Sequence, residues 1–514
     1  MKKFPIGRRF LNCDDNINCD DDTRSNIVNG LRVRKDNIMN KIAFMTLGCK
    51  VNQADTASMQ ELFRQAGYIV CDFTEEADVY VVNTCVVTNT GQQKSRQMIR
   101  RAIRKENDAL IVVTGCYPQT AAEEVKAIDG VDLIIGTQDR AKIVTLVEAA
   151  LDRKQAMKRA SEVSDSVAER IIADADSNEQ AIVQKQFVQL RTSAVDDEVR
   201  PWEQGVRFEE MSGGNEADKT RAYLKIQEGC NQYCSYCIIP YARGPIRSRS
   251  LQSIKEEVQR LTKTGYREIV LIGIHLGCYG KEMKDGTTLY DAVRAALSVP
   301  DLQRLRLGSL ESVEVEPRLL DLMAEDKRLC PHLHLPLQSG CDKVLKDMHR
   351  PYDTKRFATL LEQIRNEVPG VAITTDVIVG FPGETEDDFA ATCHFVKQCG
   401  FAKMHIFPYS KRKGTPAAAR QDQIPETVKK YRAEKLAELD REMQQAYFAQ
   451  NVGTNHAVLV EQPIITDKKA TGCVEGLTEN YIRVEFQGVP DLCGKMIDVK
   501  ITEALIDKCK GIIL

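Results

Sequence analysis

Short apolar runs alternate with amphipathic stretches in the first third of the chain, from Lys41 onwards. Four such runs are KIAFMTLGC, ADVYVVNTC, ALIVVTGCY and VDLIIGT, and a segment with helical spacing of apolar residues follows each of them. Buried parallel strands are near-continuous apolar runs, and alternation of strand and helix is typical of a parallel sheet covered on both faces. The pattern predicts a doubly wound α/β domain over residues 40–152.

A second alternating array occupies residues 219–445. Its six candidate strands are AYLKIQEG, EIVLIGIHLG, RLRLGSLES, HLHLPLQSG, AITTDVIVGF and KMHIFPY. Amphipathic segments such as LQSIKEEVQRLTKTG separate them. Six strand-helix units are fewer than the eight of a closed barrel, so the array predicts a partial (β/α)6 barrel with its chemistry at the carboxyl ends of the strands.

Three further segments complete the chain. Residues 446–514 contain the short alternating runs HAVLVE, YIRVEF and MIDVKI between Gly-containing turns, which predicts a small antiparallel β-barrel. Residues 1–39 are polar without an apolar period and predict a disordered extension. Residues 153–218 are rich in Ala, Asp, Gln and Glu and predict a linker or insertion.

Composition narrows the class of protein. The 514 residues are 43% hydrophobic and 28% charged, which is ordinary for a globular protein of several domains. No apolar run approaches a membrane span and the basic start is not followed by an export signal, so we expect a cytoplasmic protein without a membrane partner. A net charge of -3 argues against a generally basic surface, so any RNA contact must be local. The odd count of 17 cysteines favours metal or redox chemistry over disulfides.

Three cysteines lie close together in QEGCNQYCSYC, directly after the first strand of the second array. They are Cys230, Cys234 and Cys237. A structural zinc site has four ligands, whereas three thiolates on a four-iron cube leave one iron free to bind something else. The spacing therefore favours an iron–sulfur cluster with an open position, and the alternatives are three unrelated thiols or a zinc knuckle with a remote fourth ligand.

A second set of three cysteines arises from topology. Cys49, Cys85 and Cys116 each lie at or just beyond the carboxyl end of a predicted strand of the first domain. Because these ends share one edge of a parallel sheet, we expect the three to converge there as ligands of a second cluster. A single cysteine at such a position is more often a buried thiol, and the repetition of the position carries the prediction.

The spacing CxxxCxxC, with Tyr236 before its last cysteine, resembles the radical S-adenosylmethionine (SAM) superfamily. Two cysteine triads followed by a small barrel resemble its methylthiotransferase family, whose terminal barrel is called TRAM. TLGCKVNQADTASM, CIIPYARGPIRSR and TTDVIVGFPGETEDDF most resemble the tRNA-modifying branch called MtaB. The resemblance implies two 4Fe-4S clusters, SAM as co-substrate, an electron donor such as a flavodoxin or ferredoxin, and a monomer.

The same resemblance implies an activity. The family member would transfer a methylthio group to C2 of N6-threonylcarbamoyladenosine, next to the anticodon of tRNA. The cluster of Cys230, Cys234 and Cys237 would bind the SAM that yields the radical. Another SAM would methylate a sulfide associated with the other cluster, and the substrate radical would take up the resulting methylthio group. Two alternatives stay open: a methylthiotransferase for isopentenyl-adenosine in tRNA or for a ribosomal protein, and a non-enzymatic iron–sulfur or RNA-binding protein.

Other residues are assigned roles by the resemblance or by charge. The residues expected around SAM are Tyr236, Gly273, Gln338, Ser339, Gly383 and Glu384, with ordinary packing as the alternative. Arg243, Arg247 and Arg249 could hold the SAM carboxylate or RNA phosphates. The basic residues expected to contact RNA are Arg96, Arg100, Arg101, Lys411, Arg412 and Lys413, with a solvated face as the alternative. In the terminal barrel, Tyr481 and Phe486 could stack on bases or pack in its core.

Overall fold

The computed structural model describes residues 40–105, 108–174, 195–203, 205–213, 220–466 and 469–514. The predicted extension, residues 1–39, lies outside this part of the chain, as do residues 175–194, 204 and 214–218 of the predicted linker and residue 219 after it. Asn40–Leu514 form one compact unit. Within the described residues, no helix has the length and apolar character needed to cross a membrane.

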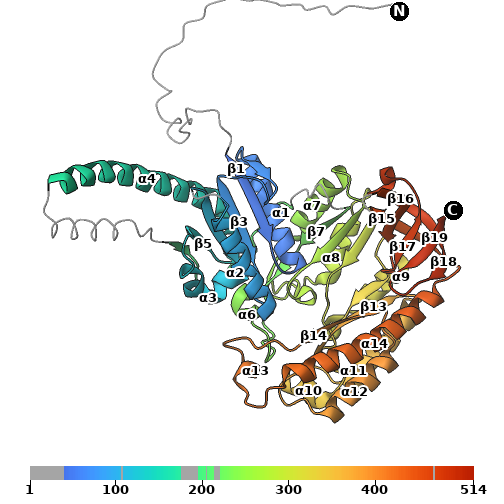
Figure 1. The fold of residues 1–514 in the computed structure, drawn as a ribbon. Coiled ribbons are helices and arrows are strands. Elements are labelled where there is room, and N and C mark those ends of the chain that lie inside the picture. Colours follow the sequence, from blue (N-terminus) through green and yellow to red (C-terminus); the bar gives the residue numbers. More distant parts are fainter. Residues whose placement is uncertain (1–39, 106–107, 175–194, 204, 214–219, 467–468) are drawn as a thin grey trace, which may run out of the picture. The chain divides into compact units, whose positions relative to one another are not determined.

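A six-stranded parallel sheet with the order β2-β1-β3-β4-β5-β6 forms the first domain (Figure 1). Its strands are β1 (Lys41–Thr46), β2 (Ile69–Cys71), β3 (Val79–Thr84), β4 (Leu110–Gly115), β5 (Leu133–Ile135) and β6 (Asp196–Glu198). Its helices are α1 (Lys50–Gln65), α2 (Asn89–Ile103), α3 (Cys116–Lys126) and α4 (Ile143–Asp174), with a 3-10 turn, η1, at Arg140–Lys142.

Helices cover both faces of this sheet. Met59 of α1 and Val147 of α4 belong to the apolar cluster on one face, and Ile99 of α2 and Val125 of α3 belong to the cluster on the other. The strand order reverses its direction at β1, which places α1 on the face opposite α2 and α3. The predicted doubly wound sheet is confirmed.

Part of the predicted linker instead belongs to this domain. Helix α4 continues past residue 152 to Asp174, and β6 pairs in parallel with β5 at the sheet edge. The apolar pattern missed β6 because its sequence, Asp-Asp-Glu, is held by backbone pairing and buries no apolar side chain. The following segment packs Trp202 against the guanidinium of Arg247 and buries Met211.

The second domain is the predicted partial barrel. Its two three-stranded parallel sheets, β11-β10-β7 and β12-β13-β14, are joined by parallel bridges, including the pair Ser309 and His334. The strands are β7 (Arg221–Lys225), β10 (Glu268–Ile272), β11 (Arg304–Leu307), β12 (His332–His334), β13 (Ala372–Val379) and β14 (Lys403–Pro408), with a short hairpin of β8 (Gln227–Glu228) and β9 (Arg247–Ser248).

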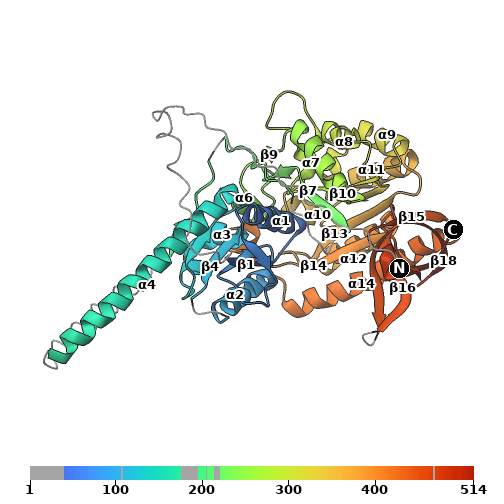
Figure 2. The ribbon, with the colours of Figure 1, turned by 90° about the horizontal axis from the view of Figure 1, so that it is seen from above.

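Helices alternate with these strands along the chain, and Figure 2 shows the domain from above. They enclose the largest apolar core among the described residues. They are α6 (Ile239–Arg243), α7 (Leu251–Lys263), α8 (Leu289–Leu297), α9 (Pro317–Glu325), α10 (Asp342–Asp347), α11 (Thr354–Glu367), α12 (Glu386–Cys399), α13 (Pro416–Ala419) and α14 (Glu426–Gln450), with 3-10 turns η2 (Leu276–Cys278) and η3 (Ser312–Glu314). All six predicted strands are present.

The chain ends in a closed barrel with the order β15-β16-β17-β19-β18. Its elements are β15 (Asn455–Thr466), β16 (Lys469–Leu477), β17 (Arg483–Gln487), η4 (Pro490–Leu492), β18 (Met496–Ala504) and β19 (Cys509–Ile513). The predicted barrel is confirmed, except that β17 and β19 pair in parallel. Arg304 and Arg306 of β11 attach it to the second domain by donating hydrogen bonds to the carbonyls of Leu477 and Thr478, each 3.0 Å long.

Candidate active site

A cavity of about 660 Å³ lies where the three domains meet. Cys49 lines it from the first domain, and Tyr481 lines it from the terminal barrel. The second domain supplies Cys230, Cys234 and Cys237 from the loop after β7, together with residues at the carboxyl ends of its strands. One cavity therefore contains a cysteine of each triad.

The loop of Cys230 is fixed by its backbone. Gly229 has a φ of 78°, and a Cβ there would lie 1.9 Å from the carbonyl oxygen of Pro245, so only glycine fits. The amide of Cys230 donates to the carbonyl of Gly244 at 3.0 Å, and the amide of Cys237 donates to the carbonyl of Cys234 at the same distance. The loop thus presents its three sulfurs in a defined arrangement.

Charged and polar partners contact two of these sulfurs. Arg350 donates from Nη1 to the sulfur of Cys234 at 3.2 Å and pairs with Glu311. His275 Nδ1 lies 3.3 Å from the sulfur of Cys230, while its Nε2 lies 2.9 Å from Glu314. The sequence alone does not predict either contact, because neither His275 nor Arg350 has a spacing that links it to the cysteine motif.

The second triad follows three adjacent strands. Cys49 precedes α1 after β1, Cys85 follows β3, and Cys116 opens α3 after β4. The turns pack tightly here: a Cβ on Gly48 would lie 2.9 Å from that of Cys85, and a Cβ on Gly115, with φ 101°, would lie 2.5 Å from the carbonyl oxygen of Thr84. Only glycine permits these approaches, which bring the loops that carry the cysteines together.

The thiols suit a metal cluster. Burial raises the pKa of Cys116 to about 11 and that of Cys237 to about 12, so both carry protons at neutral pH until a metal displaces them. In the part of the chain that the structure describes, neither triad has all three sulfurs within 4.8 Å of one another. Sulfurs around one tetrahedral zinc lie about 3.8 Å apart, given a Zn–S bond of about 2.3 Å. The open arrangement fits a four-iron cube better than a single ion.

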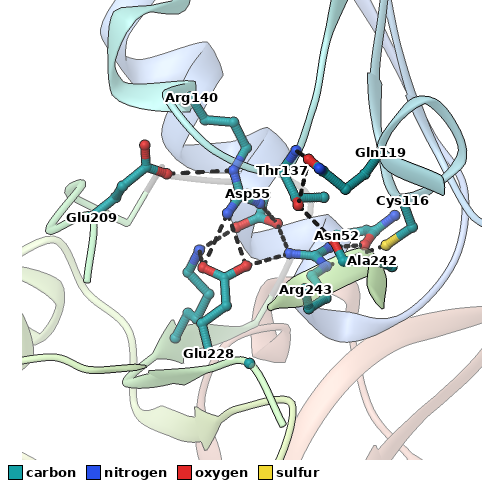
Figure 3. Close-up of polar contacts among 12 residues, drawn as sticks. Asn52, Asp55, Cys116, Gln119, Thr137, Arg140, Glu209, Glu228, Ala242 and Arg243 are labelled. Carbon is teal, nitrogen blue, oxygen red and sulfur yellow. Dashed lines mark hydrogen bonds and ion pairs between the residues drawn. The ribbon is translucent and has the colours of Figure 1, made fainter. Parts of the chain in front are cut away.

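A buried group of charges joins the first two domains (Figure 3). Glu228 accepts from Arg140 at 2.8 Å and from Arg243 at 2.6 Å, and Asp55 accepts from Arg243 at 2.8 Å and from Lys225 at 2.5 Å. Asp55 also pairs with Arg140. We call Asp55, Glu228, Arg140, Arg243 and Lys225 the seam cluster. Removal of one partner of a buried ion pair typically costs about 3–5 kcal/mol of stability, so this cluster fixes how the two domains dock.

The seam cluster also reaches the second triad. The guanidinium of Arg243 is fully buried, donates from Nε to the sulfur of Cys116 at 3.2 Å, and donates from Nη2 to Asn52. The pKa of Asp55 is held below its ordinary value because Arg140, Lys225 and Arg243 outweigh the effect of burial. The cluster therefore keeps its carboxylates charged and directs one cation at a cysteine.

The residues expected around SAM divide into two groups. Tyr236, Gly273 and Gln338 line the cavity. Ser339, Gly383 and Glu384 are not among its lining residues. Glu384 is buried and accepts from the Gly380 amide and from Arg432, both at 2.6 Å, so it fixes the turn after β13.

The arginines that follow the cysteine loop also differ from expectation. Arg243, Arg247 and Arg249 are all at least 95% buried. Arg247 donates to the carbonyl of Pro245 at 2.8 Å, and Arg249 donates to the carbonyl of Met211. A phosphate backbone cannot reach them, so the expectation of RNA contact is wrong for these three residues.

The predicted RNA contacts are partly accessible. Arg100, Arg101, Lys411 and Lys413 are exposed, and Arg96 is half-buried with Nη1 3.1 Å from the hydroxyl of Tyr117. Arg412 is 4% exposed and donates to Ser410, so the expectation of a surface contact is wrong for this residue. In the terminal barrel, Phe486 belongs to the core, whereas Tyr481 stacks on His332 with ring centroids 4.3 Å apart.

Sequence reasoning also missed a polar group in the cavity wall. His334, Asp376 and His405 lie on β12, β13 and β14, and their ligand atoms are all within 4.8 Å of one another. His334 Nε2 is 3.2 Å from Asp376. The separate strands carry no shared spacing, so only the parallel pairing of the sheet brings these residues together.

Two segments of the chain match families of known proteins. Residues 41–136 match the family described as "Uncharacterized protein family UPF0004", and residues 224–396 match the "Radical SAM superfamily". These two matches contain the two cysteine triads, one each.

Curated relatives extend over nearly the whole chain. The threonylcarbamoyladenosine tRNA methylthiotransferase MtaB of Bacillus subtilis (strain 168) is 40% identical over 466 residues, which cover 91% of this chain and 94% of the relative. The protein of the same name from Aquifex aeolicus (strain VF5) is 35% identical and is covered over its full length by 90% of this chain. The tRNA-2-methylthio-N(6)-dimethylallyladenosine synthase of Carboxydothermus hydrogenoformans (strain ATCC BAA-161 / DSM 6008 / Z-2901) is 31% identical, with 91% of this chain and 98% of the relative covered.

Proposed function

This chain belongs to the tRNA methylthiotransferase family of radical SAM enzymes, and from that premise we propose that it transfers a methylthio group to C2 of N6-threonylcarbamoyladenosine next to the anticodon of tRNA. The observation that supports this most strongly is the shared cavity, which contains Cys49 of one triad and all three cysteines of the other. Relatives named for threonylcarbamoyladenosine are 33–40% identical to this chain and those named for dimethylallyladenosine are 31–32% identical, which favours the first nucleoside.

Each domain has its own part in the proposed reaction. We propose a cluster domain at 40–152, a radical SAM domain at 219–445 and a TRAM domain at 446–514, with residues 195–213 as an extension of the first. Cys49, Cys85 and Cys116 would hold the auxiliary 4Fe-4S cluster, and Cys230, Cys234 and Cys237 would hold the cluster that binds SAM. Tyr236, Gly273 and Gln338 would contact SAM, because they line the cavity beside the second triad.

When bound, the two clusters and SAM supply one-electron cleavage of a carbon–sulfur bond and the sulfur that is transferred. The protein supplies position and exclusion of water. Arg350 and His275 direct positive charge at Cys234 and Cys230, which favours the thiolate form needed for iron binding. The seam cluster fixes the distance between the triads, and Tyr481 closes the cavity on the side of the TRAM domain.

Exposed basic residues and an electron donor complete the proposed reaction. The exposed Arg100, Arg101, Lys411 and Lys413 would contact tRNA phosphates, which are anionic and favour lysine and arginine. We further propose that the enzyme works as a monomer in the cytoplasm and receives electrons from a flavodoxin or ferredoxin, because cleavage of SAM requires a reductant.

Mass spectrometry of tRNA nucleosides tests the proposal. Deletion of the gene should remove methylthio-threonylcarbamoyladenosine and leave its unmodified precursor, and the wild-type chain should restore the product while the Cys85→Ala variant should not. Persistence of the modified nucleoside in a strain without another such enzyme would refute the assignment. Loss of the methylthio-dimethylallyl nucleoside instead would select the alternative substrate.

A further inference from the structure

Four basic side chains, apart from the histidines, line the cavity: Lys50, Arg221, Arg306 and Arg350. Each of the three arginines already has a carboxylate partner. Arg221 lies 2.7 Å from Glu461 and Arg306 lies 2.8 Å from Glu268, while Arg350 pairs with Glu311. An anionic ligand gains less from these cations than from an unpaired one, because it competes with the carboxylates.

Lys50 is different. It is the residue after Cys49, at the start of α1, and its side chain is exposed to the cavity. Its side chain makes no ion pair or hydrogen bond with any other residue that the structure describes. Its charge is therefore available to an anionic group that enters the cavity next to the auxiliary triad.

His332 is a buried side chain with one unpartnered ring nitrogen, and the charge of Lys50 acts on it. His332 is 4% exposed and lines the same cavity, and its Nδ1 has no hydrogen-bond partner among the described residues. Its Nε2 lies 3.1 Å from the hydroxyl of Thr374. Burial, followed by the charges of Arg306, His334 and Lys50, lowers the pKa of His332 well below its ordinary value, so the ring is neutral.

A buried polar atom without a partner is unfavourable, and a ligand that supplies the missing hydrogen bond removes that penalty. The cavity thus offers a free ammonium group and an unpartnered imidazole nitrogen on facing domains. Such a pair suits a ligand with a carboxylate and further hydrogen-bonding groups, and it does not suit a purely hydrocarbon substituent.

We propose that Lys50 pairs with the carboxylate of the threonylcarbamoyl group of the substrate, and that His332 Nδ1 hydrogen-bonds to the same polar group. This inference rests on the proposed function and assigns its specificity. A dimethylallyl group has neither charge nor hydrogen-bonding atoms, so it would remove water from Lys50 without giving it a partner. Lys50 is accordingly a specificity-determining residue.

Binding measurements with two tRNAs test the inference. The anaerobically loaded enzyme is titrated with one tRNA that carries threonylcarbamoyladenosine and with the same tRNA that carries plain adenosine there. The wild type should prefer the first. Lys50→Gln should weaken binding of the first about tenfold, or about 1.4 kcal/mol, and leave the second unchanged. Lys50→Arg should retain most of the preference, and Lys255→Gln, which removes an exposed lysine of α7 outside the cavity, should change neither affinity.

Each other result contradicts a defined part of the inference. If Lys50→Gln lowers the affinity for both tRNAs equally, Lys50 binds a tRNA phosphate. If the variant lowers only the affinity for SAM, Lys50 binds the SAM carboxylate. His332→Phe, which preserves a ring against Tyr481, should also reduce the preference, and an unchanged preference would remove His332 from the site. If the wild type forms no methylthio product from the threonylcarbamoyl tRNA, the proposed function and this inference both fail.

Discussion

Arg243 donates a hydrogen bond from Nε to the sulfur of Cys116, 3.2 Å away across the seam between the first two domains. The same guanidinium is paired with Asp55 and Glu228, so its position depends on both domains. A single side chain thus links domain docking to a predicted ligand of the auxiliary cluster.

Removal of this contact should lower the reduction potential of the auxiliary cluster. A hydrogen bond and a positive charge at a ligand sulfur stabilise the more negative, reduced form, so Arg243→Gln should make reduction harder. Arg243→Lys preserves the charge and should shift the potential less. Redox titration followed by electron paramagnetic resonance measures the effect. A variant with full iron content and an unchanged potential would show that Arg243 acts only in docking.

Neutralisation of one carboxylate in the seam cluster should weaken domain docking. Asp55→Asn leaves three buried cations with one carboxylate fewer. We expect the free energy of unfolding, measured with urea, to fall by about 3–5 kcal/mol. The matched control is Glu438→Gln, which breaks an exposed pair with Lys435 and should cost at most about 1 kcal/mol. Similar urea midpoints for the two variants would show that the seam cluster does not hold the domains together.

Acid should weaken the attachment of the terminal barrel to the second domain through Glu268. Burial alone would raise its pKa, but Arg306 and Arg304 lower it to about 2 from a model-peptide value of about 4.5. Because the folded-state pKa is depressed, the stabilisation is complete above pH 4.5 and is lost as the pH falls through 4.5 toward 2. Its size is on the order of 3 kcal/mol.

The variant Glu268→Gln isolates this contribution. The difference in stability between the wild type and the variant should shrink steadily between pH 4.5 and pH 2, as followed by urea unfolding at each pH. A difference that does not depend on pH in this window would show that the carboxylate charge of Glu268 is not what stabilises Arg304 and Arg306.

Local patterns could predict the strands and the cysteines, because each leaves a periodic or spaced signal in the sequence. The repeated position of Cys49, Cys85 and Cys116 after strands predicts that they converge at one edge of the sheet. Asp55, Arg140 and Glu228 could not be found, since they are polar residues of ordinary surface type whose burial arises only when two domains dock. Arg412 was misassigned for the same reason: a basic run does not reveal which of its members points inward.

Iron content after anaerobic reconstitution tests the central claim, that two separate three-cysteine sites each hold a four-iron cube. The wild type should bind about eight irons, and replacement of Cys49, Cys85 and Cys116 by alanine should leave about four. That variant should still cleave SAM to 5′-deoxyadenosine but form no methylthio nucleoside. A wild-type protein that binds only about four irons, or a variant that still binds eight, would contradict the account.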